Sequence, residues 1–553
     1  MVSTASEKTV EILAEIRACM ELKGENVFKI RAYEKAEKVL HGRDDIEARA
    51  KAGTLTELQG IGKGIAAVVE EFLKTGRSEE LEELRKSIPP ALRELSRVPG
   101  LGPKKAQTVM QELGIQSLGE LEYACRENRL AGLKGFGEKM QAKILEGVQF
   151  AMATQGQLRW VDAQAHDRAV RDALRAAGVE FEGAGAFRRR LEVISDLEYV
   201  VKLSGAGPKA GRGGAADPRA AAEEGLKRFL GHQPGALPVK LHFAEVPRFG
   251  TALARATGTP EHWAALGKPD KVDAPTEEAF YAALKLPYIE PELRETGEEV
   301  ALARAGGLKG LLPWNGVRGV FHNHTVESDG VATLEEMVAE ARRLGFAYIG
   351  ISDHSQSAFY ARGLKSEALT AQEKAIRKLQ EKYDDIRIFW GVESDILQDG
   401  SLDYPDEVLA RMDFVIASIH SRFQMDKAAM TERILTAVRN PRTTMLGHLT
   451  GRLLLGRKGY DMDFEQVFAE CTKRKVVVEI NAHPQRLDVD WRWGPRLRAL
   501  GVNVSVNPDA HEVAGLSDVV NGVAVARKAL LPAAQVVNSR DAAGVERWLR
   551  ERS

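Results

Sequence analysis

The sequence has few cysteines, few aromatic residues and no excess of either charge. Three cysteines, Cys19, Cys125 and Cys471, are spread over 553 residues without a Cys-x-x-Cys pair. This spacing argues against a disulfide framework and suits a reducing cytosol. Because the formal net charge is only −1, any affinity for nucleic acid must come from local patches of positive charge.

Long hydrophobic runs are also absent. No apolar stretch reaches the roughly 18 residues of a transmembrane helix, and the opening MVSTASEKTVEILAEI mixes acids with apolar residues, unlike a signal peptide. With 44% hydrophobic and 28% charged residues, the composition is that of a folded globular protein. A chain of this length is too long to fold around a single hydrophobic core, so about three to five domains are expected.

One short motif recurs three times in the first third of the chain, where apolar spacing predicts successive helices. The copies are LQGIGKGIA (58–66), VPGLGPKKA (98–106) and LKGFGEKM (133–140). Two glycines permit a tight turn, and the helix that follows directs its N–H groups and lysines at a phosphate. Plain helical hairpins with glycine turns explain three copies poorly. The candidate DNA-binding residues are Gly60, Gly62, Lys63, Gly100, Gly102, Lys104, Gly135 and Gly137.

These segments resemble helix-hairpin-helix motifs, which hold the DNA backbone without reading its sequence. The segment NVFKIRAYEKAEKVL (26–40) resembles the N-terminal helical domain of X-family DNA repair polymerases. The resemblance implies that Lys29 helps to hold a 5′-phosphate at a gap. Lyase members of that family carry a Schiff-base lysine where this chain has Val68, so lyase activity is not expected.

The stretch VISDLEYVVKL (193–203) places Asp196 and Glu198 on one face of a predicted strand. Such a pair can hold a divalent metal, or it can be the solvated side of an edge strand. The longer segment 183–203 resembles the palm of the same polymerases. The resemblance implies metal-binding, catalytic roles for Asp196 and Glu198, with Mg²⁺ or Mn²⁺ if the palm is active, and nucleotide binding by Arg188 and Arg189.

The palm departs from the family pattern at several positions. Ala186 replaces a serine, and Lys240 in PVKLHFAEV (238–246) stands in place of a third metal-binding aspartate, unless Glu245 on the same strand takes that role. A nucleotide-binding turn is matched by Thr257 and Gly258, but Trp263 replaces an expected asparagine. Since nucleotidyl transfer uses two metals, these changes predict a degenerate polymerase site. The Gly- and Ala-rich run 204–224 is expected to be a solvated loop.

From residue 317 onward, short β-rich runs alternate with helical stretches, the rhythm of a β/α barrel. Nearly every run ends in a potential metal ligand, and the strand ends of such a barrel converge at one mouth. A single histidine is more often a core residue than a ligand, but six at equivalent strand ends are hard to explain by chance. The candidate ligands are His322, His324, Asp329, His354, Glu393, His420, His448, Asp509 and His511.

These nine residues match the ligand motifs of the PHP (polymerase and histidinol phosphatase) domain. The resemblance implies a cluster of up to three metals, Mn²⁺ and/or Zn²⁺, bridged by Glu393, and catalytic roles for His322, His324, Glu393, Asp509 and His511. The run VVVEINAHP ends in no expected ligand, and its His483 is interpreted as pocket wall. Arg452 and Arg486 are candidate phosphate clamps. Asp353 and Asp403 are candidates for orienting the ligands.

The resemblance covers essentially the whole chain and predicts a multidomain protein. The expected parts are a helical DNA-binding domain with the first hairpin (1–80), a helical domain with the other two (81–155), an α+β polymerase palm (156–245), a nucleotide-binding or thumb-like subdomain (246–300), a linker (301–316) and a PHP metallo-phosphoesterase domain (317–553) folded as a distorted (β/α)7 barrel.

The leading hypothesis is a DNA repair protein with a metal-dependent 3′→5′ exonuclease and a degenerate DNA-directed polymerase site. It is expected to be a cytoplasmic, nucleoid-associated monomer that binds gapped or 3′-recessed DNA through the backbone, with dNTP as a possible further ligand. Two alternatives stay open. One is an active gap-filling polymerase with its own trimming nuclease. The other is a DNA-binding scaffold whose PHP site hydrolyses a small phosphomonoester.

Overall fold

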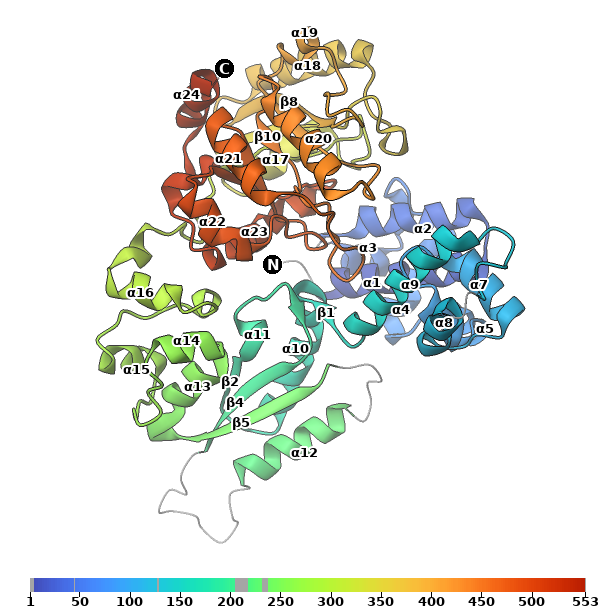
Figure 1. Ribbon diagram of the computed structural model, residues 1–553. Helices are drawn as coiled ribbons and strands as arrows, with labels where there is room; N and C mark the ends of the chain where they lie inside the picture. The colour runs from blue at the N-terminus through green and yellow to red at the C-terminus, as the bar shows by residue number, and fades with distance from the viewer. Residues whose placement is uncertain (1–3, 44, 127–128, 204–216, 231–236, 553) are drawn as a thin grey trace. The chain divides into compact units, whose positions relative to one another are not determined.

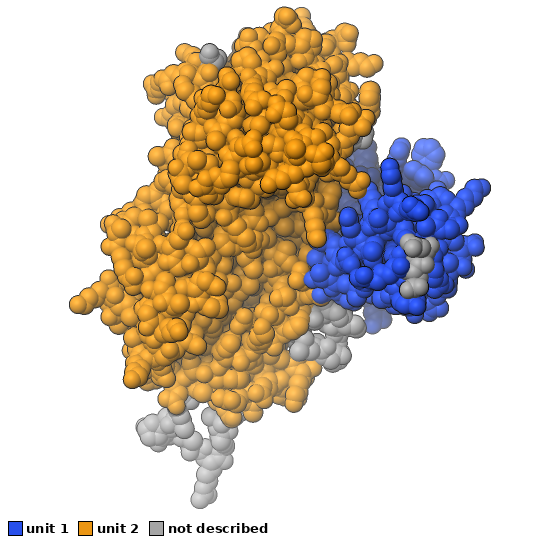
Figure 2. All heavy atoms as spheres, in the orientation of Figure 1, with its two compact units in different colours: residues 1–155, 512–514 blue, residues 156–511, 515–553 orange. Residues whose placement is uncertain are grey.

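The computed structural model describes residues 4–43, 45–126, 129–203, 217–230 and 237–552. The chain forms two compact units, one of residues 1–155 with 512–514 and the other of residues 156–511 with 515–553 (Figure 2). Within the described residues, no helix is both long and apolar enough to cross a membrane.

The first unit is built from helices around one apolar core (Figure 1). In α4, for example, Ile65, Val68 and Val69 are buried, the spacing of a helix that covers a core with one face. The helices are α1 (Thr4–Lys23), α2 (Val27–Leu40), α3 (Ile46–Ala52), α4 (Lys63–Thr75), α5 (Glu79–Ser87), α6 (Pro90–Leu95), α7 (Gly102–Leu113), α8 (Leu118–Arg126) and α9 (Gly137–Thr154).

The three repeated motifs fold alike around their first glycine. Each has a first glycine with positive φ, +111° at Gly60, +86° at Gly100 and +89° at Gly135. The apolar residue that follows is buried and donates its backbone N–H to the carbonyl three residues earlier, at 3.0, 3.0 and 3.1 Å. The helix that starts directly after each turn is α4, α7 or α9. The second glycine differs, with φ −80° at Gly62 but +62° at Gly102 and +56° at Gly137, so the backbone geometry repeats only in the first half of the motif.

The second unit begins with a small α+β layer. Its sheet has the order β2–β4–β5, with β4 antiparallel to β2 and parallel to β5. Helices α10 and α12 pack beside β4, and β1 and β3 form a separate antiparallel pair. The elements are β1 (Leu158–Arg159), α10 (Trp160–Ala176), β2 (Phe181–Ala184), α11 (Gly185–Arg188), β3 (Val193–Ile194), β4 (Leu197–Leu203), α12 (Pro218–Leu230) and β5 (Val239–Glu245).

Helix α12 corrects part of the loop expected at 204–224. Residues 204–216 lie outside the described residues, but the chain is helical from Pro218 onward. Alanine and glutamate are strong helix formers, and Ala222 and Leu226, four residues apart, are buried against the sheet layer. The alanine content that suggested a flexible loop therefore serves a helix in this half of the segment.

Short helices follow and pack around a core that includes Phe280 and Tyr281. They are α13 (Phe249–Thr257), α14 (Pro260–Ala265), α15 (Glu277–Ala283) and α16 (Glu298–Arg304).

The rest of the chain is a parallel barrel of seven strands in the order β6 to β12. An isolated parallel bridge between Asn323 and Ala510 brings its first and last strands together. The strands are β6 (Gly319–Val320), β7 (Tyr348–Ile351), β8 (Arg387–Asp395), β9 (Phe414–Ser418), β10 (Met445–Leu446), β11 (Val477–Asn481) and β12 (Val504–Asn507). The helices are α17 (Leu334–Arg343), α18 (Ser366–Lys382), α19 (Asp406–Leu409), α20 (Lys427–Arg439), α21 (Phe464–Arg474), α22 (Gly494–Ala499), α23 (Val519–Lys528) and α24 (Ala542–Arg552). The expected (β/α)7 fold is confirmed.

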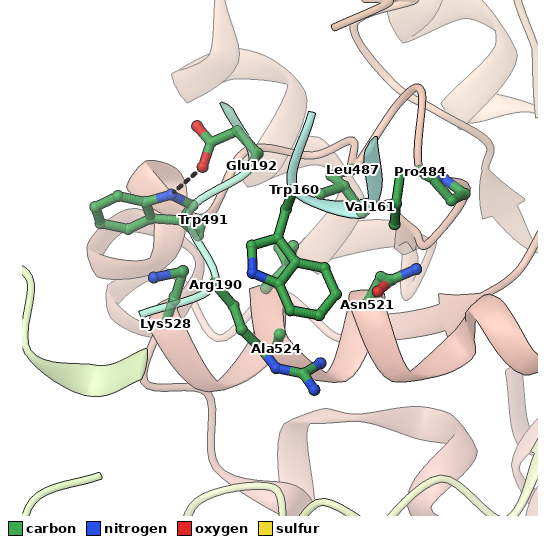
Figure 3. A pocket seen from close by; sticks show the side chains of 11 residues that line it. Trp160, Val161, Arg190, Glu192, Pro484, Leu487, Trp491, Asn521, Ala524 and Lys528 are labelled. Carbon is green, nitrogen blue, oxygen red and sulfur yellow. Dashed lines mark hydrogen bonds between the residues drawn. The ribbon is translucent and has the colours of Figure 1, made fainter. Parts of the chain in front are cut away.

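The sheet layer and the barrel meet at a closely packed junction (Figure 3). Glu192 accepts hydrogen bonds from the Trp491 indole at 3.1 Å and the Arg492 guanidinium at 2.5 Å. Buried Lys528 of α23 pairs with buried Glu295 at 2.6 Å. The cavity beside them holds only about 20 Å³, room for about one water. The junction is therefore a structural contact and has no space for a ligand.

Candidate active site

The candidate ligands of the barrel come from six strand ends that converge at its mouth. His322 and His324 follow β6, His354 follows β7, and Glu393 lies near the end of β8. The other ligands follow β9, β10 and β12: His420, His448, Asp509 and His511. Most of the cluster is buried, whereas the side chains of Asp329 and His511 remain 30% and 35% exposed. This exposure gives the cluster an opening to solvent.

Glu393 lies at the centre of the cluster. Its two oxygens are 2.9 Å from His448 Nε2, 3.0 Å from His354 Nδ1, 3.2 Å from His420 Nε2 and 3.3 Å from His322 Nε2. Two ligands at about 2.1 Å from one tetrahedral ion lie roughly 3.4 Å apart. The distances are therefore close to those between ligands that share an ion, and Glu393 would be one of the residues that hold it.

Several possible donor atoms in the cluster have no hydrogen-bond partner, and this bears on whether the residues fit a metal. Among the described residues, His322 Nε2, both ring nitrogens of His324 and Glu393 Oε2 are buried without a hydrogen bond. Buried polar atoms of this kind are costly unless something binds them. Four sets of donors each lie close enough to hold one ion: His324–Asp329–His354–His511, His322–Glu393–His448, His322–His324–Asp509 and His354–Glu393–His420. The site fits divalent metals.

The protonation states also suit metal binding. Burial and the neighbouring imidazoles lower the pKa of His324 to about 4, so its ring is neutral. Burial raises the pKa of Glu393, but the surrounding imidazoles outweigh this and hold it well below its ordinary value. Burial lowers the pKa of His354, yet Glu393 and Asp329 raise it to about 10. A cation bound at His354 must therefore displace a proton.

A second layer of carboxylates positions the ligands. Glu479 accepts from His322 Nδ1 at 2.7 Å and from the backbone N–H of His448 at 2.7 Å. Asp395 accepts from His420 Nδ1 at 2.6 Å. Because Nδ1 is bonded in His322 and His420, each ring presents Nε2 to the cluster. The sequence analysis missed Glu479 and Asp395. Glu479 lies on β11, the strand on which no ligand was expected.

Asp353 and Asp403, which the sequence suggested as residues that orient the ligands, each hold a loop beside the cluster. Asp353 accepts from the Thr325 backbone at 2.7 Å and the Ser328 hydroxyl at 2.5 Å, which fixes the loop that carries Asp329. Asp403 accepts from the backbone N–H of Ser357 at 2.7 Å, in the loop after His354.

The two candidate phosphate clamps differ. Arg486 Nε lies 3.4 Å from Asp509 Oδ2, so its guanidinium borders the cluster. Arg452 is occupied by Asp490 and by the carbonyls of Arg486 and Leu487. Of the two, only Arg486 thus borders the cluster, whereas Arg452 holds a loop. Burial lowers the pKa of His483 to about 4, so this residue is a neutral side chain at the same mouth.

In the sheet layer, Asp196 directly precedes β4 and Glu198 is in it. Because β4 is the central strand, the edge-strand interpretation is wrong. Lys240 lies opposite Glu198 in the register, and its Nζ is 2.7 Å from Asp196 Oδ2. His242 Nε2 is 2.7 Å from Glu198 Oε2, and this hydrogen bond lowers the pKa of Glu198. Each carboxylate is thus paired with a basic side chain of β5.

The strand register also shows whether Glu245 could serve as the third metal ligand of the palm. It is paired with Leu203, five residues along β4 from Glu198. At about 3.3 Å per residue this separation is roughly 16 Å. Glu245 cannot complete a metal site with Asp196 and Glu198.

Comparison with known proteins identifies the family. A helix-hairpin-helix domain model matches residues 5–78, a SAM-like helix-hairpin-helix tandem model matches residues 52–114 and 92–149, and a PHP domain model matches residues 321–483. A protein of Bacillus subtilis named DNA polymerase/3′-5′ exonuclease PolX is 33% identical over 98% of both chains. The chain belongs to the bacterial X-family DNA polymerases with a PHP domain.

Other relatives match the PHP domain alone. A probable phosphatase of Caldicellulosiruptor saccharolyticus is 32% identical over 29% of this chain and 64% of its own. One of Thermoanaerobacter pseudethanolicus is 26% identical over 42% of this chain and 94% of its own. The helix-hairpin-helix domains and the polymerase family together indicate DNA binding.

The two arginines that the sequence predicts to bind nucleotide both contact protein groups. The guanidinium of Arg188 binds both oxygens of buried Glu277, at 2.9 and 2.6 Å. Arg189 donates to Glu295 at 3.0 Å and to the carbonyl of Thr257 at 2.6 Å. The structure does bring the two arginines to the Thr257–Gly258 turn. Both arginines are, however, already engaged by protein carboxylates, which they share with buried Arg294 and Lys528.

Two further positions can be placed. Trp263 is buried and stacks on Phe280 at 5.6 Å between ring centres, so it belongs to the helical core. Lys29 pairs with Glu80 at 2.8 Å, and Tyr33 donates to the same carboxylate at 2.5 Å. A 5′-phosphate at Lys29 would take the place that the Glu80 carboxylate holds.

Proposed function

We propose that this X-family protein is a DNA repair enzyme of the nucleoid whose working chemistry is metal-dependent 3′→5′ hydrolysis of DNA at the PHP site. Its helix-hairpin-helix turns and Lys29 hold gapped or 3′-recessed DNA by the backbone. The metals are Mn²⁺ and/or Zn²⁺, because the donors are imidazoles and carboxylates without thiolates. The enzyme acts as a monomer.

The observation that carries this proposal is the distance set around Glu393. Five histidine nitrogens lie within 3.6 Å of its two oxygens, all from strand ends of one barrel mouth. A satisfied core network would pair these nitrogens with acceptors of their own. Here they share one carboxylate, so histidines and glutamate together would hold metal ions.

The chain's residues prepare the site for a phosphodiester. Glu479 and Asp395 hold the rings of His322 and His420 with Nε2 directed inward, and Arg486 presents a cation for a phosphate oxygen. Bound metals, held by the nine ligands, would supply Lewis acidity toward water and the phosphate oxygens. Hydrolysis with this donor set needs no protein nucleophile.

The palm is proposed to be degenerate. Lys240 and His242 occupy the two carboxylates that would bind metal, while Glu277 and Glu295 hold the arginines that would bind the triphosphate. Templated synthesis needs both sets free. We expect weak synthesis at most, even if dNTP binds.

A single gel tests the proposal against the alternative of an active gap-filling polymerase. A labelled primer in a gapped duplex is incubated with Mn²⁺, with and without dNTPs. We expect progressive shortening of the primer under both conditions. Filling of the gap that disappears in Asp196→Ala would support the polymerase and overturn the palm assignment.

The relatives that match the barrel favour a second candidate at the same site. Several are named probable phosphatases, so hydrolysis of a phosphomonoester is the competing chemistry. An oligonucleotide ending in a 3′-phosphate separates the two. Release of inorganic phosphate without any shortening of the strand would favour the phosphatase.

A further inference from the structure

Exposed apolar side chains gather on one side of the barrel mouth. Among the described residues from 317 onward, the large hydrophobic side chains that are exposed are Phe359 at 86%, Val326 at 40%, Val520 at 39% and Val331 at 37%. Three of these four lie on the loops after β6 and β7. These strands are neighbours in the sheet, and they carry His322, His324 and His354 into the cluster. We call Phe359, Val326 and Val331 the apolar arc.

The loop that carries Phe359 is held firmly to the metal cluster. Ser355 donates its backbone N–H to the carbonyl of Glu393 at 3.0 Å, and Leu364 donates to the carbonyl of His354 at 2.8 Å. Ser357 donates its hydroxyl to Asp395, the residue that orients His420, at 2.9 Å. Both ends and the middle of the loop are therefore tied to ligands or to their partners. The backbone that carries the exposed ring is thus held at the mouth.

The valines are fixed in the same way. Val326 donates its N–H to the carbonyl of Ala332 at 2.9 Å, and Val331 donates to the carbonyl of His511 at 2.8 Å. Thr325 and Glu327, on either side of Val326, line a cavity of about 260 Å³ together with Leu334, Ile351, Ala371, Gln372 and Ala375. Single exposed hydrophobic residues need no explanation, but a rigid group beside a reactive cluster indicates a binding surface.

Positive charge lies on the other strands of the mouth. Arg422 is exposed two residues after His420, and Arg486 borders Asp509 in the segment after β11. The exposed apolar groups of the mouth thus lie on the loops of β6 and β7, and cationic side chains lie on the loops of β9 and β11 and, at exposed Arg362, beside Phe359 on the loop of β7. A nucleic-acid strand has the matching polarity, because its bases are flat and apolar on their faces and its phosphates are anionic.

We propose that the apolar arc, with Phe359 as its main contact, stacks the bases of the strand whose end is hydrolysed, while Arg422 and Arg486 hold its phosphates. The proposal rests on the DNA hydrolysis proposed above and assigns a specificity-determining residue to it. Stacking on an aromatic side chain tolerates any base but requires that a base be present. Phe359 therefore selects for nucleic acid over small phosphate esters without reading sequence.

The test uses the full-length protein with Mn²⁺ and three substrates. They are a single-stranded oligonucleotide, the same strand with abasic residues at its 3′ end, and bis(4-nitrophenyl) phosphate, which has no base to stack. The variants are Phe359→Ala, Phe359→Trp and, as a matched control, Val520→Ala, which removes an exposed side chain of α23 outside the arc.

Phe359→Ala should raise KM for the oligonucleotide by roughly 10- to 100-fold with little change in kcat. It should leave hydrolysis of bis(4-nitrophenyl) phosphate unchanged, and Phe359→Trp should restore KM. Wild type should cleave the abasic strand as poorly as Phe359→Ala cleaves the normal one. Equal KM for wild type and Phe359→Ala on the normal strand would overturn base stacking by the apolar arc but not the proposed hydrolysis of DNA. Wild type that hydrolyses the small ester and never shortens DNA would overturn both.

Discussion

Replacing Lys240 by aspartate should create a metal site in the palm. In the structure, the Lys240 ammonium lies 2.7 Å from the Asp196 carboxylate, where a cation would have to bind. The substitution changes the local charge by two units. For a divalent ion at about 4 Å, each unit is worth about 2 kcal/mol at the dielectric of water. Because the Lys240 side chain is 56% exposed, this screened value applies, and the total is about 4 kcal/mol.

This energy corresponds to roughly a thousandfold gain in Mn²⁺ affinity. Lys240→Met, which removes the charge without adding a carboxylate, should give about half the energy and roughly a thirtyfold gain. Titration with Mn²⁺, with the free ion followed by electron paramagnetic resonance, counts bound ions for each chain. We expect Lys240→Asp to bind one more ion than wild type, and Lys240→Asp with Asp196→Ala to lose it. If the wild type already binds Mn²⁺ as tightly as Lys240→Asp, at a site that Asp196→Ala removes, then Lys240 does not block metal binding and the prediction is refuted.

Glu479→Gln weakens the hydrogen bond that orients His322, so metal affinity should fall about 10- to 100-fold, as measured by chelator competition, with exposed Glu381→Gln as the control. Arg486→Ala should raise KM for oligonucleotides roughly tenfold or more and leave the melting temperature nearly unchanged. Arg452→Ala should show the reverse, losing about 2 kcal/mol of unfolding free energy in urea titrations, because its hydrogen bonds to Asp490 and to the carbonyls of Arg486 and Leu487 are lost while Arg492 still pairs with Asp490. Gly100→Ala strains a residue at φ +86°, and it should weaken binding of gapped duplex in fluorescence anisotropy without slowing hydrolysis of a small ester.

The barrel and its nine candidate ligands could be predicted because the signals are local. Each ligand sits at the end of a β-rich run, and the topology of a β/α barrel brings such ends together. Glu479 could not be found in this way. It is buried inside a strand, and its role depends on His322, which lies 157 residues earlier in the sequence. Only the closed barrel shows that the two meet.

The palm also has some features that the sequence predicts and others that only the fold shows. The sequence placed Lys240 beside the carboxylates through a family pattern, and the register confirms that it faces Glu198. His242, two residues further on the same face of β5, escaped notice because no motif required it. Arg188 and Arg189 matched the family pattern as well. Their partners Glu277 and Glu295 lie 89 and 106 residues away, and only the folded chain brings them together.

The most direct test of the account compares Asp509→Ala with Asp196→Ala in one measurement, the rate at which Mn²⁺ drives shortening of an oligonucleotide from its 3′ end. The account places the chemistry in the barrel, so Asp509→Ala should lose nearly all activity and Asp196→Ala should match wild type. Shortening by Asp509→Ala at the wild-type rate would contradict the account.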